Sequence, residues 1–259
     1  MNPVDYHFEA VTLLITHYNR SQSLERLLAA FATLRCSFGA IIVSDDCSKP
    51  EHQRVLLHLR DQYDFSMITT PQNRGLGNNI NKGQDAVKTP YTLYIQEDFV
   101  PKPAFIQRFR QALTFMHEDE ALDLVRFWTF LPYPYVKPYK EGFSEIVISR
   151  WAPNYKKVFA YTDQPHLRRS SFGDKFGRYA ENINSDKMEY RMCISFFQKK
   201  GRAVFFNDFY GLLSHENNEL EPSTATAIRF WWQQKDQSVI AAVRYVYRQV
   251  KYNYDIQFM

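Results

Sequence analysis

The first hundred residues alternate between short apolar runs and amphipathic segments, and this alternation constrains the fold more than any other feature of the chain. Apolar runs with the length and composition of buried strands lie at residues 11–16, 40–43, 65–69 and 91–95. Between the first two runs, Leu24, Leu28 and Phe31 share one face of a predicted helix. Ser21 is its predicted N-cap. The alternation predicts an α/β fold with a mostly parallel sheet and right-handed crossovers.

Two of the predicted strands end in paired acids. Asp45 and Asp46 follow the second strand, and Glu97 and Asp98 follow the fourth. Ligands of open α/β sheets bind beyond the carboxyl ends of the strands, where carboxylates could hold Mg²⁺ or Mn²⁺. Two structural alternatives stay open: the first pair could cap the next helix, and the second could solvate a turn.

Composition limits the number of domains, the kinds of partner and the cellular location that the chain can have. With 259 residues it could form one large domain or two small ones, and its net charge of +4 does not indicate a nucleic-acid partner. The 3 cysteines are widely spaced and form neither a zinc pattern nor a disulfide framework. We find no signal-peptide pattern at residues 1–5 and no apolar run near the roughly 20 residues of a membrane span. We therefore expect a cytoplasmic protein.

A glycine pair after the third strand does not indicate an NAD site. Gly75 and Gly77 could open a dinucleotide-binding fingerprint, but Ile80 stands where the third glycine is required. That fingerprint also follows the first strand of its fold and not the third.

The order of four polar motifs resembles a family 2 glycosyltransferase of the GT-A fold. The motifs are Ile15-Thr16-x-Tyr18-Asn19-Arg20, Ile42-Val43-x-Asp45-Asp46-x-Ser48, Asn73-x-Gly75 with Asn81-x-Gly83, and the acidic strand end at Glu97-Asp98. The resemblance covers about the first hundred residues and implies a three-layer α/β fold that binds a nucleotide-sugar. We expect a single catalytic domain over residues 1–220 and a helical extension over 221–259. About 1–115 would bind the donor, and about 116–220 the acceptor.

The resemblance also implies roles for single residues. Thr16, Tyr18 and Arg20 match positions that hold the nucleotide base and diphosphate, and Asp46 matches the carboxylate that reads the nucleobase edge. Asp98 matches the last acid of the family's Asp-x-Asp motif, which contacts the Mn²⁺ or Mg²⁺ ion. Gln96 stands where the first acid is usual. The predicted substrate-binding residues are Thr16, Tyr18, Asn19, Arg20, Asp45, Asp46, Asn73, Arg74, Gly77, Glu97 and Asp98.

The second half offers candidates for the catalytic base and a further metal ligand. Members of this family commonly place an acidic pair at the start of a helix, about a dozen residues before the glycine that ends it, and Glu189 has this spacing to Gly201. Asp186 lies one helical turn earlier on the same face. Both acids could instead only stabilise the helix N-terminus. His215 is the candidate second metal ligand, with a structural role as its alternative.

Other predicted elements of the second half are strands at residues 122–130, 145–149, 157–161 and 202–206, and a helix over 227–254. The last helix combines aromatic with basic side chains, which is typical of an interfacial helix on anionic lipid. Packing on the catalytic domain or in a homodimer stays open as an alternative.

The resemblance implies an enzyme that moves a sugar from a nucleotide-sugar, with a UDP-sugar favoured, to a hydroxyl of a glycan or lipid-linked acceptor. It implies inversion at the anomeric carbon and a place in polysaccharide or lipopolysaccharide synthesis. Two alternatives remain. A nucleotidyltransferase would carry a glycine-rich basic loop after the first strand, which residues 17–20 are not. A catalytically silent nucleotide-sugar or glycan-binding protein is compatible with the neutral Gln96.

Overall fold

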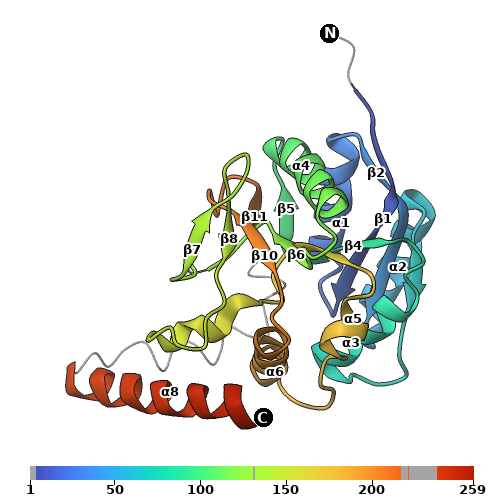
Figure 1. The fold of residues 1–259 in the computed structure, drawn as a ribbon. Helices are drawn as coiled ribbons and strands as arrows, with labels where there is room; N and C mark the ends of the chain where they lie inside the picture. Colours follow the sequence, from blue (N-terminus) through green and yellow to red (C-terminus); the bar gives the residue numbers. More distant parts are fainter. Residues whose placement is uncertain (1–3, 131, 217–220, 222–237) are drawn as a thin grey trace.

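The computed structural model describes residues 4–130, 132–216, 221 and 238–259 (Figure 1). Within these residues, the main sheet has the strand order β3-β2-β1-β4-β9-β6-β10-β8-β7. Its strands are β1 (Tyr6–His17), β2 (Cys36–Asp45), β3 (Ser66–Ile68), β4 (Tyr91–Gln96), β6 (Leu124–Arg126), β7 (Val136–Pro138), β8 (Phe143–Ile146), β9 (His166–Arg169) and β10 (Ala203–Phe206). A small second sheet pairs β5 (Phe99–Pro101) with β11 (Leu213–His215).

The first four strands are parallel, as the alternating pattern predicts. β1 lies between β2 and β4, and β3 pairs with the outer side of β2. The helices that connect them are α1 (Ser21–Thr33), α2 (Pro50–Tyr63) and α3 (Gly75–Asp85). Because these strands run in one direction, the segments after β1, β2 and β4 meet at one edge of the sheet.

The other half of the sheet is mixed. β9 is antiparallel to both of its neighbours, β4 and β6, and so reverses the strand direction. The helices of this half are α4 (Ala104–Glu118), the 3₁₀ helix η1 (Tyr155–Ala160), α5 (Phe172–Phe176), α6 (Ser185–Gln198) and α8 (Ser238–Phe258). In Figure 1, α8 lies beside α6 and the segment that contains η1.

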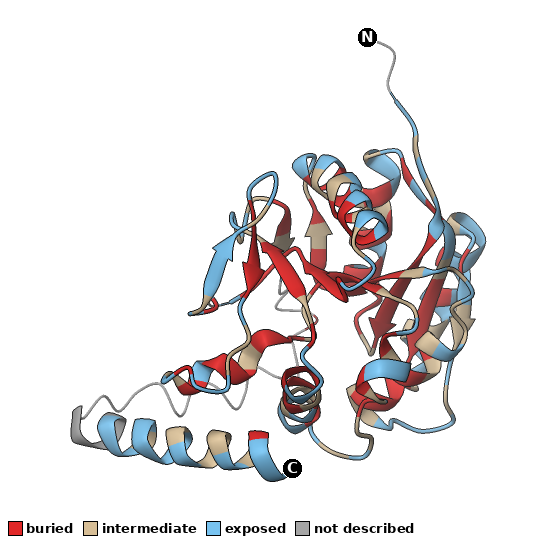
Figure 2. Ribbon diagram, in the orientation of Figure 1, coloured by how far each residue is buried: buried red, intermediate tan, exposed pale blue. Residues whose placement is uncertain are grey.

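Helices cover both faces of the sheet, so that the core forms two layers. The side chains of β1 alternate between them: Leu13 and Ile15 pack with α1, α2 and α4, whereas Leu14 packs with α3, α5 and α6. The inner strands of the sheet are accordingly buried over most of their length, whereas the edge strand β7 is exposed (Figure 2). This arrangement confirms the predicted three-layer α/β architecture.

Several predicted elements of the second half differ from the structure. The strand expected at residues 157–161 is wrong, because this segment belongs to the 3₁₀ helix η1. The Asn154 side chain accepts a hydrogen bond from the Lys156 backbone N–H at 2.9 Å and caps this helix. Tyr155 and Val158, spaced by one turn, are both buried. The strand expected at 122–130 is limited to β6, and the one at 145–149 is shifted to β8.

The predicted C-terminal helix is present over the part of its range that the structure describes. α8 covers Ser238–Phe258, and residues 227–237 of the expected helix lie outside the described part of the chain. No helix among the described residues has the length and apolar character needed to span a membrane.

Candidate active site

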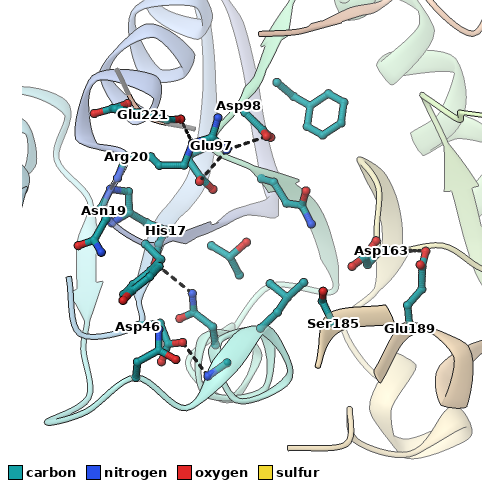
Figure 3. Close-up of a pocket in the computed structure, with 18 of the residues that line it drawn as sticks. His17, Asn19, Arg20, Asp46, Glu97, Asp98, Asp163, Ser185, Glu189 and Glu221 are labelled. Atoms are coloured by element: carbon teal, nitrogen blue, oxygen red, sulfur yellow. Dashed lines mark hydrogen bonds and ion pairs between the residues drawn. The ribbon is translucent and has the colours of Figure 1, made fainter. Parts of the chain in front are cut away.

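A cleft of about 890 Å³ opens at the carboxyl ends of β1, β2 and β4 (Figure 3). Most of the predicted site residues meet there. Those that line it are Thr16, Tyr18, Asn19, Arg20, Asp46, Asn73, Glu97, Asp98, Asp186, Glu189 and His215. Asp45, Arg74 and Gly77 are predicted site residues that do not line it. The cleft therefore joins the two halves of the sequence, with the strand-end acids on one side and α6 on the other.

Asp46 lies at the N-terminus of α3. Its Oδ1 accepts a hydrogen bond from the backbone N–H of Arg74 at 2.8 Å, and its Oδ2 accepts one from Gly75 at 2.7 Å. Gly75 has a φ of +81°, a conformation that glycine adopts without strain. The carboxylate thus both caps the helix and faces the cleft. Each oxygen keeps a further acceptor position, because a carboxylate offers about four lone-pair sites.

Asp45 lies behind the wall of the cleft and is fully buried. Its Oδ1 accepts hydrogen bonds from Ser48 Oγ at 2.5 Å and pairs with His17 Nδ1 at 2.8 Å. Burial opposes ionisation of Asp45, but the hydrogen bonds from His17 and Ser48 outweigh it and lower its pKa. Asp45 therefore holds the His17 ring in place. His17, which sequence reasoning missed, lines the cleft itself.

Arg74 and Gly77 act outside the cleft. The Arg74 guanidinium pairs with Glu181 at 3.0 Å. A Cβ at Gly77 would lie 2.3 Å from the carbonyl oxygen of Ala180, so only glycine lets α3 pack this closely on the segment before α6. These two residues hold the start of α3 against the second half of the chain.

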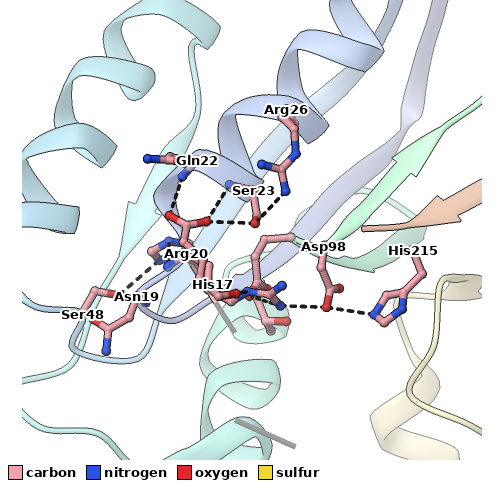
Figure 4. Close-up of polar contacts among 12 residues, drawn as sticks. His17, Asn19, Arg20, Gln22, Ser23, Arg26, Ser48, Asp98 and His215 are labelled. Carbon is pink, nitrogen blue, oxygen red and sulfur yellow. Dashed lines mark hydrogen bonds and ion pairs between the residues drawn. The ribbon is translucent and has the colours of Figure 1, made fainter. Parts of the chain in front are cut away.

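Arg20, Asp98 and His215 form a chain of polar contacts across the cleft (Figure 4). Arg20 Nη1 donates to Asp98 Oδ2 at 2.7 Å and to Glu97 Oε1 at 3.3 Å. His215 Nε2 lies 3.1 Å from the same Asp98 oxygen. His215 reaches this position because β11 pairs with β5, directly after the two acids.

The two strand-end acids differ in their ionisation. Burial, and after it the neighbouring charge of Asp98, raise the pKa of Glu97 to about 8 against the opposing charge of Arg20. Burial also opposes ionisation of Asp98, but the hydrogen bond from His215 and the charge of Arg20 outweigh it and lower the pKa of Asp98. The pair thus separates into one protonated and one ionised carboxyl near neutral pH.

The residues around Asp98 fit a hard divalent cation. Asp98 Oδ1 is buried and has no hydrogen-bond partner among the described residues. His215 adds a nitrogen next to the same carboxylate. The described residues contain no group of three or more His, Cys, Asp or Glu side chains that could hold a metal ion by themselves. Mg²⁺ is commonly bound by one or two protein ligands together with substrate phosphates, which agrees with this small set.

Glu221 contributes to the site from far along the chain and was not predicted. Its carboxylate accepts hydrogen bonds from the backbone N–H groups of Gln22 and Ser23, both at 3.0 Å, and so caps α1. Its carbonyl oxygen accepts a hydrogen bond from Arg20 Nε at 3.1 Å. The predicted cap, Ser21, instead contacts His52 at 2.9 Å. No local pattern in the sequence could have revealed a cap supplied from some 200 residues away.

Across the cleft, Glu189 faces Asp163 (Figure 3). Glu189 Oε1 accepts a hydrogen bond from the Asp163 backbone N–H at 3.2 Å, and the two carboxyls are hydrogen-bonded to each other. Burial raises the pKa of both groups, and in Asp163 the charge of Glu189 adds to the shift. Asp186 is exposed at the first turn of α6. Asp163 was missed because it lies in the loop before β9, a strand that the sequence pattern did not predict.

The chain belongs to glycosyl transferase family 2, because the model of that family matches residues 12–184. This range contains both strand-end acid pairs and the Asp163 loop. The family assignment confirms the predicted resemblance.

Among curated proteins, the chain is similar to the poly-beta-1,6-N-acetyl-D-glucosamine synthase of Staphylococcus aureus strain COL, with 25% identity over 92 residues. The same synthase of Staphylococcus epidermidis is 24% identical over 92 residues. In both cases the match covers 36% of this chain and 22% of the synthase, so the chain spans well under a third of the curated relatives' length.

Two solved structures share the fold. The structure of S. aureus TarS 1–349 in complex with UDP-GlcNAc has a TM-score of 0.59 at 16% identity, covering 86% of this chain and 63% of that one. The mannosyltransferase PcManGT from Pyrobaculum calidifontis, in complex with GDP-Man and Mn²⁺, has a TM-score of 0.55 at 12% identity, covering 77% of this chain and 55% of that one. These similarities confirm the predicted GT-A fold.

Proposed function

We propose that the chain is a glycosyltransferase that moves a sugar from a nucleotide-sugar to a hydroxyl of a glycan or lipid-linked acceptor, in polysaccharide or lipopolysaccharide synthesis. The observation that carries this proposal is the cleft itself. On its donor side lie Asp46 and the Arg20–Asp98–His215 chain, and on its far side lies the Asp163–Glu189 pair. The UDP-GlcNAc and GDP-Man named for the two solved relatives support a nucleotide-sugar donor.

The donor would occupy the edge where the parallel strands end. We propose that Asp46 accepts a hydrogen bond from the nucleobase, because its oxygens keep free acceptor positions that face the cleft. We favour a UDP-sugar, because the ring N–H of uracil can donate a hydrogen bond to this carboxylate and a structural relative binds UDP-GlcNAc. Thr16, Tyr18, Asn19 and Asn73 would complete the nucleotide pocket.

We propose that Asp98 and His215 hold Mn²⁺ or Mg²⁺ together with the donor's phosphates. When bound, this ion would neutralise charge that develops on the departing nucleotide diphosphate. Arg20 is held beside Asp98 by its hydrogen bonds to Asp98 and to the Glu221 carbonyl oxygen. Its guanidinium can therefore stabilise the same developing charge without first having to be oriented.

We propose that Glu189 is the catalytic base. The acceptor hydroxyl oxygen forms a bond to the anomeric carbon, the bond from that carbon to the diphosphate oxygen breaks with its electron pair, and Glu189 takes the hydroxyl proton. The Asp163 backbone N–H orients Glu189 Oε1, and the raised pKa of Glu189 makes it a stronger base. A single displacement of this kind inverts the anomeric configuration.

We further propose that residues 1–220 act as one catalytic domain. The main sheet runs without a break from β3 in the first half to β7 in the second, which supports this assignment. About 1–115 would bind the donor and about 116–220 the acceptor.

The proposal predicts that a nucleotide stabilises the protein through Asp98. In a thermal-shift panel of UDP, GDP, dTDP and CMP, one nucleotide at about 100 times its Kd with Mn²⁺ should raise the Tm by about 5 °C or more. Asp98→Asn should lose the Mn²⁺-dependent part of this shift, because the amide cannot supply the charge. Asp61→Asn, on an exposed side chain of α2, is the matched control and should keep it. If no nucleotide shifts the Tm, with or without Mn²⁺, the donor site is refuted.

Turnover separates this proposal from a silent binding protein. If wild type binds a nucleotide-sugar but neither transfers nor hydrolyses its sugar, the binding-protein alternative stands instead.

A further inference from the structure

A second cleft of about 680 Å³ opens next to the first. The two share Phe130, Gln164, Asp186 and Glu189 in their linings, so the second cleft leads to the proposed base. Its walls come from the segment after β6, from η1, from the start of α6 and from α8. The donor-side strands contribute nothing to it within the described residues.

The walls of the second cleft are aromatic. Among the residues that line it are Tyr133, Tyr155, Phe159, Tyr190 and Tyr252. Several of these rings support one another: Tyr252 contacts Tyr155, Phe159 and Tyr190 with ring centroids 5.0 to 6.0 Å apart. Rings held in this way offer flat apolar faces, which suit the C–H faces of sugar rings.

The charge of the second cleft is positive. Its basic lining residues are Arg126, Lys156, Lys187, Arg248 and Lys251, and its acidic ones are Asp186 and Glu189. Lys156 and Lys187 are exposed and pair with no carboxylate of the described residues. Lys251 pairs with Asp255, which lies outside the lining, but the other four cationic side chains still outnumber the two carboxyls, so the cleft concentrates anions.

The floor of the cleft contains a buried cation with an incomplete set of partners. Arg126 is 3% exposed, and its Nη2 donates to Thr129 Oγ1 at 3.0 Å. Among the residues that the structure describes, its Nε has no hydrogen-bond partner, and Glu189, whose charge acts on the guanidinium, makes no ion pair with it. A buried guanidinium without a paired anion is costly, and an anionic ligand would offset that cost.

We propose that the second cleft binds the acceptor and that this acceptor is an acidic oligosaccharide, with a carboxylate or phosphate group close to the sugar that accepts. This inference rests on the proposed transferase function and adds the class of its acceptor. The aromatic walls would take the sugar rings, Arg126 and the lysines would take the acidic group, and the shared residues would place a hydroxyl at Glu189. A neutral glycan would leave the Arg126 guanidinium unpaired.

Calorimetric titration of the full chain, with saturating UDP and Mn²⁺ present, tests the charge preference. The probes are tetragalacturonate, its carboxyl-reduced neutral counterpart, and pentamannose with and without a 6-phosphate. We expect at least one acidic probe to bind about tenfold or more tightly than its neutral counterpart, and its affinity to fall with added salt. Tighter binding of tetragalacturonate would identify a carboxylate as the recognised group, and tighter binding of the phosphorylated pentamannose would identify a phosphate.

Matched variants test the location. The double variant Lys156→Gln/Lys187→Gln should weaken the acidic probe about tenfold or more, with no change in UDP affinity. Lys88→Gln/Lys199→Gln removes the same charge from exposed positions outside both clefts and should have no effect.

Three outcomes would overturn the proposal of an acidic acceptor. They are equal affinity for acidic and neutral probes, no binding of any probe while UDP still binds, and an unchanged affinity for the acidic probe in the Lys156→Gln/Lys187→Gln variant. Failure of UDP itself to bind would instead refute the proposed donor site.

Discussion

At the scale of single residues, the site depends on neighbouring side chains that give two similar carboxyl groups different protonation states. Glu97 and Asp98 are adjacent in sequence, yet burial raises the pKa of Glu97 to about 8, whereas His215 and Arg20 lower that of Asp98 despite its burial. The sequence indicated an acidic strand end, but not this division, because His215 comes from more than a hundred residues away. Only the pairing of β11 with β5 brings it there.

The raised pKa of Glu97 predicts a pH-dependent stability. Between its usual value of 4.5 and about 8, the folded chain keeps a proton on Glu97 that the unfolded chain releases. The free energy of unfolding should therefore fall as the pH rises through this window, by at most about 1.4 kcal/mol per pH unit from this group. Glu97→Gln, which mimics the protonated form, should lack this contribution.

Urea unfolding of both proteins between pH 5 and pH 8.5 measures it, and the difference between them removes the contributions of other titrating groups. Identical pH slopes for wild type and Glu97→Gln would contradict the prediction.

The base assignment predicts a loss of turnover without a loss of donor binding. Glu189→Gln keeps the size of the side chain but cannot take a proton, so kcat should fall about 100-fold or more. The Kd for the nucleotide should not change. Asp186→Asn is the matched control on the same face of α6, and its exposed side chain makes a smaller effect the expected result. A larger loss of kcat in Asp186→Asn than in Glu189→Gln would transfer the role to Asp186.

At the scale of elements, the alternating pattern predicted the parallel half of the sheet because its strands are apolar on both faces. It failed at β9, which carries His166, Arg168 and Arg169. Arg168 is nevertheless fully buried, with its guanidinium 5.3 to 5.7 Å from the ring centroids of Tyr94, Phe172 and Tyr179. Because the charged side chains of β9 are buried against aromatic faces, the strand lacks the apolar pattern by which strands are predicted. The sequence therefore revealed neither the change of strand direction at β9 nor the Asp163 loop that precedes this strand.

The capping of α1 by Glu221 makes this helix depend on the C-terminal segment. Glu221→Gln removes the charge that faces the first-turn N–H groups of Gln22 and Ser23 and should lower the free energy of unfolding by about 1 kcal/mol. Glu25→Gln, exposed on the same helix, is the matched control and should have little effect. Urea unfolding at pH 7 measures both. Equal stability of the two variants would mean that Glu221 does not cap α1 in solution.

At the scale of the whole molecule, α8 has two unlike faces. Ile256 is 4% exposed, and Tyr190 donates a hydrogen bond from its hydroxyl to Asp255 at 2.6 Å, so one face packs on α6. The opposite face presents Val243, Val250, Tyr254 and Phe258, which are 62% to 69% exposed. Packing on the catalytic domain, one of the predicted roles, therefore uses only half of the helix.

We expect the exposed stripe to contact an anionic lipid surface, because α8 combines these apolar side chains with basic ones, among them Arg244 next to Val243. The protein should sediment with vesicles that contain phosphatidylglycerol and much less with pure phosphatidylcholine vesicles. Val250→Ser/Tyr254→Ser should abolish this binding, whereas Val136→Ser/Tyr210→Ser, exposed apolar positions elsewhere, should not. A concentration-dependent dimer that the first pair of substitutions dissociates, with no vesicle binding by wild type, would instead assign the stripe to a second copy of the chain.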